Sequence, residues 1–222
     1  MNNRNNFMNV QTKTRQGRVT KDRRVGIKSA RGITAMAMLS AISVILMLFE
    51  IPLWFAPSFY EIDFSEVPVL IGAFALGPLA GVVIELLKIL LNLAINGTMT
   101  MFVGEFANFL IGIAFVVPAA IIYQRKKTKK SAMIGLVIGT VFMVLVGAVL
   151  NAYVLIPAFA KAFQMPIETI VEMGTMVNPG IQSLWDLILL AVVPFNLLKG
   201  VLVSFVTGLI YKGVSSLIKG FH

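Results

Sequence analysis

Five long apolar runs constrain this chain more than any other feature of its sequence. They cover residues 32–56, 67–96, 102–123, 131–160 and 181–211. About twenty apolar residues are enough for a helix to cross the hydrocarbon core of a bilayer, and every run is longer than that. Of the 222 residues, 58% are hydrophobic and only 13% are charged, whereas soluble domains are about 25% charged. We therefore expect an all-α integral membrane protein.

Two basic clusters set the number of membrane spans. Nine lysines and arginines lie between Arg4 and Arg31, and five lie between Arg125 and Lys130. Cytoplasmic loops carry the excess of Lys and Arg, so both clusters are inside only if an even number of spans separates them. The 67–96 run must then turn near Gly77-Pro78 and supply two helices. The sequence predicts six transmembrane helices, with the N- and C-termini cytoplasmic.

Charge also divides the chain into regions. We expect a disordered basic cytoplasmic tail at residues 1–31, a six-helix membrane domain at 32–215 and a short cytoplasmic C-terminal tail at 216–222. Basic clusters beside apolar runs are topology signals, so the net charge of +9 does not indicate a nucleic-acid partner. Segments 50–66 and 161–183 carry an acidic excess and are placed outside. The acidic residues of the first are Glu50, Glu61, Asp63 and Glu66.

Several chemistries are excluded by residues that the sequence lacks. It contains no cysteine and a single histidine, His222. Disulfides, thiol catalysis, thiolate or histidine metal sites and histidine-based triads are therefore not available. The motif G-x-x-x-x-G-K-[ST] is also absent, so the chain has no ATPase site of the P-loop type. We expect a protein that is not an enzyme and holds no metal or cofactor.

Three different helices bring polar side chains to a similar predicted depth. Each helix is anchored at its cytoplasmic basic residues, and about twenty residues are counted outward from there. This places Asn151 at the outer boundary, Asn108, Asn196 and Lys199 one to two turns inside, and Glu105 at the rim. Each Asn is explained either by a hydrogen bond between helices or by a ligand contact. Lys199 has no acidic neighbour on its own helix, which favours a role in binding.

An aromatic loop follows the first helix and is expected to lie above these residues. It includes Phe55 and Tyr60. Its rings form either a belt at the membrane interface or a lid that stacks on a flat aromatic ligand. Amides offer a donor beside an acceptor, and one ammonium suits a carbonyl or ring nitrogen. The pocket is therefore expected to take a weakly charged, partly aromatic small molecule.

Two other patterns each have a structural and a functional interpretation. Glu85 and Lys88 lie mid-depth, three residues apart, and form either an internal ion pair or a relay for protons or ions. Small residues at four-residue spacing either pack helices inside the bundle or, at the first helix, face a partner protein. These include the pairs Ala37/Ala41 and Gly135/Gly139.

Several segments together resemble one family of membrane proteins. The first helix is similar to that of the S components of energy-coupling factor (ECF) transporters, and four further segments resemble the riboflavin-specific members in particular. The five segments are 35–50, 63–68 (DFSEVP), 71–81 (IGAFALGPLAG), 104–108 (GEFAN) and 194–200 (PFNLLKG). They occur in the family's order, and the resemblance covers residues 32–215.

The resemblance implies a high-affinity riboflavin-binding subunit in the bacterial cytoplasmic membrane, with riboflavin as transported ligand. Its implied partners are a transmembrane coupling subunit and two ATPase subunits. Carried over by motif, Asn151, Asn196 and Lys199 would hold the polar edge of the flavin ring. The 50–63 loop and the fourth helix would close around the ligand, which makes Tyr60, Phe55, Asn108 and Glu105 further candidates. Ala37 and Ala41 would face the coupling subunit.

The residues alone leave other functions open. The same family includes members for thiamine, biotin and folate, which sequence chemistry does not separate well. A self-contained, ion-coupled transporter would use Glu85 or Lys88 as its relay. A small structural membrane subunit would bind no ligand.

Overall fold

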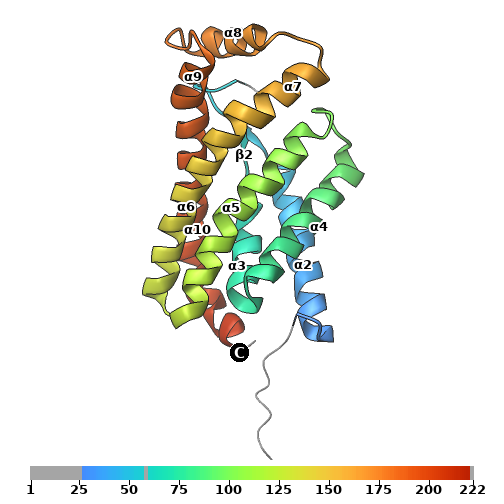
Figure 1. Cartoon of the computed structure of the whole chain (residues 1–222). Coiled ribbons are helices and arrows are strands. Elements are labelled where there is room, and N and C mark those ends of the chain that lie inside the picture. Colours follow the sequence, from blue (N-terminus) through green and yellow to red (C-terminus); the bar gives the residue numbers. More distant parts are fainter. Residues whose placement is uncertain (1–26, 58–59, 221–222) are drawn as a thin grey trace, which may run out of the picture.

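The chain folds into a helical bundle whose elements run along one another between two ends (Figure 1). The computed structural model describes residues 27–57 and 60–220. The first half contains α2 (Ala30–Met47), α3 (Glu66–Leu76), α4 (Pro78–Asn96) and α5 (Val103–Lys126). The second half contains α6 (Lys129–Leu150), α7 (Ile156–Ala162), α8 (Ile167–Val177), α9 (Leu184–Leu187) and α10 (Val193–Gly220). Two π-helical turns, η1 (Asn151–Leu155) and η2 (Ile188–Val192), join α6 to α7 and α9 to α10.

Five helices of the described part are long and apolar enough to cross a membrane. Two of them run through a π-helical turn, so that α6, η1 and α7 form one helix from Lys129 to Ala162, and α9, η2 and α10 form another that begins at Leu184. The sixth predicted helix is α3, which has only 11 residues, or about 17 Å of helix. The predicted all-α membrane fold is confirmed, with five helices of membrane length and one short one.

The predicted turn inside the 67–96 run is confirmed. α3 ends at Leu76 and α4 begins at Pro78, with Gly77 between them at φ 104°. A residue with a side chain rarely adopts this backbone conformation, whereas glycine does so freely. Pro78 then occupies the first position of α4, where its missing N–H costs no helical hydrogen bond. This dipeptide divides one long apolar run into two antiparallel helices.

The segment between α2 and α3 corrects one prediction. Its short strands β1 (Ile51–Pro52) and β2 (Glu61–Ile62) pair antiparallel. After β2 the chain enters the bundle, and Asp63 and Glu66 are only 2% and 1% exposed. The whole of 50–66 was expected outside because it is acidic. That expectation is wrong for Asp63 and Glu66, since lysines from other helices neutralise them inside the protein.

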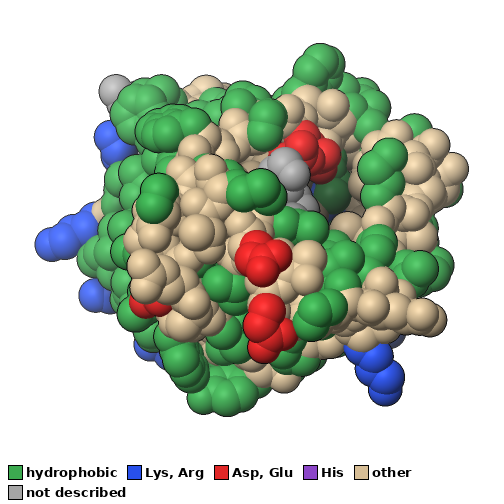
Figure 2. Space-filling view, turned by 90° about the horizontal axis from the view of Figure 1, so that it is seen from above, with side chains coloured by type: hydrophobic (Ala, Val, Ile, Leu, Met, Phe, Trp, Pro, Cys, Tyr) green, Lys and Arg blue, Asp and Glu red, His purple; other side chains and the backbone are tan. Residues whose placement is uncertain are grey.

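The described chain begins and ends at the same end of the bundle. The start of α2, the α3–α4 and α5–α6 turns and the end of α10 lie there, whereas α7, α8 and the start of α9 lie at the other end (Figure 1). Figure 2 views that second end, where acidic side chains gather near the centre and basic ones only at the rim. Most of the predicted N-terminal tail, residues 1–26, lies outside the described residues. Of the predicted C-terminal tail, residues 216–220 continue α10.

Two apolar clusters fill the bundle, one at each end. The first joins α3, α4, α5, α6 and α10 and includes the stacked rings of Phe74 and Tyr123. Glycines allow close helix packing within it, because a Cβ on Gly135 would lie 2.6 Å from the carbonyl oxygen of Ala119. The packing interpretation of Gly135 is therefore confirmed. The second cluster joins η1, α7, α8 and η2, next to the predicted binding residues.

Candidate functional site

Two π-helical turns mark the region where the predicted residues meet. η1 begins at Asn151, and η2 ends four residues before Asn196. A π-helical turn breaks the regular i to i−4 hydrogen-bond ladder, and such turns often occur at functional sites. η1 also contacts η2 and α5 directly. The helices that carry Asn151 and Asn196 are thus both irregular at this level.

Asn151 is buried and hydrogen-bonded through both ends of its amide. Its Oδ1 accepts a 2.8 Å hydrogen bond from the hydroxyl of Tyr60, and its Nδ2 donates to the carbonyl of Gly147 at 2.8 Å. The ring of Tyr60 also packs against Phe195, with 5.2 Å between ring centroids. The aromatic loop therefore reaches into the bundle and contacts the predicted site.

Asn196 is 1% exposed and only half satisfied. Its Nδ2 donates to the carbonyl of Val192 at 2.9 Å, but its Oδ1 has no hydrogen-bond partner among the residues that the structure describes. It lies against the Asn151 helix, because a Cβ on Gly147 would come within 2.9 Å of its amide nitrogen. A buried acceptor without a donor is costly, so a donor from a ligand would stabilise this arrangement.

Lys199 forms a buried ion pair with Asp63. The two atoms, Lys199 Nζ and Asp63 Oδ2, are 2.9 Å apart, and the residues are 6% and 2% exposed. The sequence showed no acidic neighbour for Lys199 on its own helix, and the partner instead comes from 136 residues earlier in the chain. An ammonium carries three donors, and Asp63 is the one hydrogen-bond partner found for it among residues 27–57 and 60–220.

The aromatic loop combines features of both predicted alternatives. Phe55 and Tyr60 pack against the second apolar cluster, near η1 and η2. Trp54, by contrast, is 82% exposed and touches Phe55 edge-on. An exposed ring suits an interfacial belt, and rings packed beside the asparagines suit a lid.

The other two predicted ligand residues lie apart from these contacts. Asn108 and Glu105 are half-buried near the start of α5. Glu105 accepts a 2.8 Å hydrogen bond from Thr100, which stabilises the α4–α5 connection. No described contact joins either residue to the three predicted residues of η1 and α10, so their role in binding stays a prediction.

Ala37 and Ala41 are exposed on α2, away from the core. Larger apolar side chains flank them, with Met38 62% exposed and Ile45 56% exposed. The pair does not pack a neighbouring helix of this bundle, and it lies on a surface open to lipid or to a partner.

Glu85 and Lys88 form the internal ion pair predicted from their spacing, with 2.8 Å between Nζ and Oε1. The sequence missed the third member, Glu66, whose Oε1 is also 2.8 Å from the ammonium. Ser65 Oγ accepts from the same nitrogen at 3.2 Å. All these residues are at most 1% exposed. Lys88 thus donates hydrogen bonds to Glu66 and Ser65 and forms an ion pair with Glu85.

Glu50 lies just before β1, near Glu61 and Asp63. Burial, a hydrogen bond with Glu61, and the charges of Glu61 and Asp63 raise the pKa of its carboxyl to about 7. Within the described segments, no group of three or more histidine, cysteine or acidic side chains is arranged to hold a metal ion.

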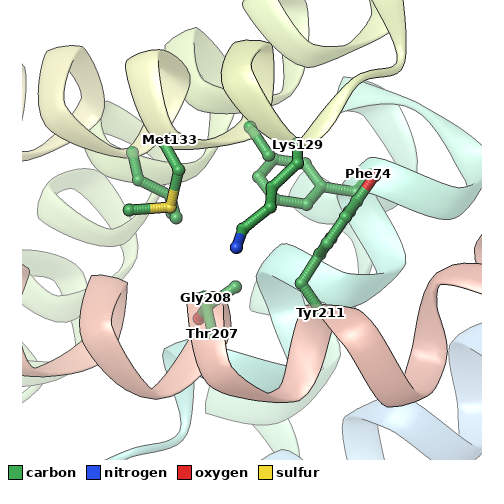
Figure 3. A pocket seen from close by; sticks show the side chains of 8 residues that line it. Phe74, Lys129, Met133, Thr207, Gly208 and Tyr211 are labelled. Carbon is green, nitrogen blue, oxygen red and sulfur yellow. The ribbon is translucent and has the colours of Figure 1, made fainter.

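A shallow pocket lies near the opposite end of the bundle (Figure 3). It lies between α3, α6 and α10 and is too narrow to enclose a cavity for a water molecule, and Lys129 points across it toward α10 near Gly208. None of the predicted ligand residues lines it. Leu136 is its lining residue nearest to Asn151 along this helix, and 15 residues, or about 22 Å of helix, separate the two.

Comparisons with known proteins give one consistent result. The profile described as "ECF transporter, substrate-specific component" matches residues 31–211. The chain is 34% identical to "Riboflavin transporter RibU" of Staphylococcus aureus (strain TCH60), over 89% of this chain and 97% of that protein. It is 32% identical to "Riboflavin transporter FmnP" of Bacillus subtilis (strain 168), over 81% and 89%. A solved structure described as "Structure and mechanism of the S component of a bacterial ECF transporter" covers 84% of this chain and 96% of its own, with TM-score 0.64 and 35% identity.

Proposed function

The chain belongs to the substrate-specific components of ECF transporters, and we propose that it is a riboflavin-binding subunit of such an importer. It is a multi-pass membrane protein and not an enzyme; the relatives named above are transporters. Its own role is to capture the vitamin, since it has no ATPase motif.

One observation on α10 carries this proposal. Asn196 offers a buried acceptor without a partner, and Lys199, three residues further on, has two donors left beside Asp63. Positions three apart share one helix face. The flavin ring carries an imide N–H between two carbonyls, so its edge needs an acceptor flanked by a donor. That requirement fits the unused groups of Asn196 and Lys199.

Asn151, Tyr60 and Phe55 complete the proposed site. Asn151 binds the same polar edge once its Oδ1 is released by the Tyr60 hydroxyl that donates to it. Tyr60 and Phe55 supply aromatic surface for stacking on the flavin ring. Asn108 and Glu105 remain candidates for contacts of the polar side chain of riboflavin, on the resemblance to the family alone.

Charge supports an orientation with the site facing outward. One end of the bundle is basic, because the turn between α5 and α6 (residues 125–130) lies there. An excess of Lys and Arg marks the cytoplasmic side of a membrane protein. We place both chain termini there, and the site beneath the acidic end in Figure 2 outside. Riboflavin therefore enters from outside.

Release of the vitamin inside requires partners. An ECF substrate-specific component works with an energy-coupling module. We propose that this module consists of one transmembrane coupling subunit and two ATPase subunits, and that the exposed Ala37/Ala41 face of α2 docks on the coupling subunit. Small side chains let another helix approach closely in lipid.

A fluorescence titration tests the binding proposal. Purified protein in detergent is expected to quench flavin fluorescence at one riboflavin per chain, without displacement by thiamine or biotin. Asn196→Ala is expected to weaken binding by about 1–3 kcal/mol, because a ligand donor loses its buried acceptor. Asn96→Ala, which truncates an exposed asparagine of α4, is the matched control and leaves binding unchanged. A wild-type protein that fails to quench added flavin refutes the proposal.

A further inference from the structure

The loop that enters the bundle contributes a residue that the binding proposal does not yet use. Asp63 approaches the site from the β2–α3 segment and forms the ion pair with Lys199. An isolated ammonium in a buried position is expensive and tends to lose its proton. A carboxylate at 2.9 Å offsets that cost and keeps the lysine charged.

Asp63 is itself held in place from several sides. Its other oxygen, Oδ1, accepts a 2.6 Å hydrogen bond from the backbone N–H of Ser65. The Ser65 carbonyl accepts a 3.0 Å hydrogen bond from the Ser43 hydroxyl of α2. The Ser65 hydroxyl accepts a 3.2 Å hydrogen bond from the Lys88 ammonium of α4. Three helices, α2, α4 and α10, therefore fix one short segment. This geometry leaves the Asp63 carboxylate little freedom to move with Lys199.

The two buried lysines of the described part differ in a way that separates structural from binding roles. Lys88 has three polar partners within the protein, because it donates to Glu66 and Ser65 and forms an ion pair with Glu85. Lys199 has one partner among the described residues, Asp63, and keeps two donors for a ligand. An ion pair that served only to join α10 to the loop would not need unused donors beside the unused acceptor of Asn196.

We propose that Asp63 is a positioning residue for ligand binding, which keeps the Lys199 ammonium charged and directed toward the carbonyl edge of the ligand. This inference rests on the proposed function. Binding then requires the carboxylate of Asp63 from the loop as well as residues of the long helices. Asp63 does not itself touch the ligand in this account.

Several charged groups besides Asp63 lie near Lys199, and a test has to separate their effects from that of Asp63. Asp63 faces Lys199 from the loop, and Glu66 of α3 and Lys88 of α4 act on it from further away. Glu85 pairs with Lys88, and Glu50 lies on the same side as Asp63. Of these, only Asp63 contacts Lys199 directly, so its removal is expected to change the protonation of Lys199 most.

The test is Asp63→Asn, with riboflavin affinity measured by fluorescence across neutral and alkaline pH. The asparagine keeps an acceptor for the Ser65 N–H but removes the charge. We expect affinity to fall about tenfold or more, corresponding to about 1.4 kcal/mol, and to fall further as pH rises, because Lys199 gives up its proton at lower pH than in the wild type. Glu66→Gln, the matched control, removes a carboxylate of similar burial that does not contact Lys199, and it should change the pH profile much less than Asp63→Asn.

Two more variants separate positioning from stability. In a Lys199→Met background, Asp63→Asn is expected to cause no further loss of affinity, since its effect passes through the lysine. Asp63→Glu keeps the charge but moves it by one methylene, so it should retain the wild-type pH profile at lower affinity. This variant decides the question if Asp63→Asn does not fold. Wild-type affinity in either Asp63 variant, or equal losses with and without Lys199, overturns the proposal.

A measurement without ligand keeps this inference distinct from the riboflavin proposal. Isotopically labelled lysine side chains are followed by NMR, and the signal missing in Lys199→Met identifies Lys199. We expect that signal to titrate at lower pH in Asp63→Asn than in the wild type. An unchanged titration refutes the charge-holding role, whatever ligand the protein binds.

Discussion

Replacing Lys88 by methionine tests whether the buried charges of α3 and α4 stabilise the bundle. The Lys88 ammonium is 2.8 Å from a carboxylate oxygen of both Glu66 and Glu85, and none of the three residues is more than 1% exposed. At an effective dielectric constant of about 20, each attraction is worth about 6 kcal/mol before the cost of burial is subtracted. Removing one partner of a buried pair costs about 3–5 kcal/mol net, because the remaining charge stays buried without compensation.

The assay is thermal unfolding of the purified protein in one detergent at one pH. In a protein of this size each kcal/mol lowers the melting temperature by about 2–4 °C, so Lys88→Met is expected to lose about 10 °C. Lys126→Met, at an exposed position of α5, is the matched control and should change little. Adding Glu85→Gln to Lys88→Met is expected to restore part of the loss, since one uncompensated carboxylate is removed. A Lys88→Met protein that melts within about 2 °C of the wild type would refute this reasoning.

Three further predictions concern the helix packing, the docking face of α2 and the Glu50 carboxyl. Gly135→Ala is expected to destabilise the fold by about 1–3 kcal/mol in the same thermal assay, because its Cβ would lie 2.6 Å from the carbonyl oxygen of Ala119. Ala41→Leu should leave riboflavin binding intact but impair uptake by cells; unchanged uptake would remove this face from the interface. The raised pKa of Glu50 means that the folded protein binds this proton more tightly than the unfolded chain, so stability falls as pH rises from 4.5 to about 7. Glu50→Gln should flatten that part of the melting-temperature profile, and an equal slope in both proteins would contradict the assignment.

Features set by local sequence were predictable. The Gly77-Pro78 turn follows from the conformational freedom of glycine and the missing N–H of proline, and the pair Glu85 and Lys88 follows from helical spacing. The membrane fold follows from apolar composition. In each case the residues that decide the structure lie within a few positions of one another.

Features that depend on distant partners were not predictable. Asp63 is buried because Lys199, 136 residues later, neutralises it, and a hydropathy argument can only assign such a carboxylate to water. The π-helical turns likewise have no sequence signal, although one begins at Asn151 and the other ends four residues before Asn196. One sign was available for the ion pair: a lysine expected at membrane depth without an acidic neighbour on its helix needs a carboxylate from elsewhere.

Two helices also extend beyond the ends that were predicted by counting about twenty residues outward from the basic anchors. Asn151, placed at the outer boundary, lies inside a helix that continues to Ala162, and Asn196, placed one to two turns inside that boundary, lies about three turns into a helix that begins at Leu184. The count assumed that each helix stops where the hydrocarbon does, whereas these helices extend further and pack against α8 and each other. The predicted residues still meet, because both helices are longer at the same end.

The most direct test of the whole account is uptake of labelled riboflavin by cells that have no flavin importer of their own. The cells express this chain alone, with the coupling subunit and intact ATPase subunits, or with ATPase subunits that cannot hydrolyse ATP. We predict that surface binding occurs in all three cases and that accumulation inside the cell occurs only with intact ATPase subunits. Accumulation by the chain alone would contradict the account and favour a self-contained transporter.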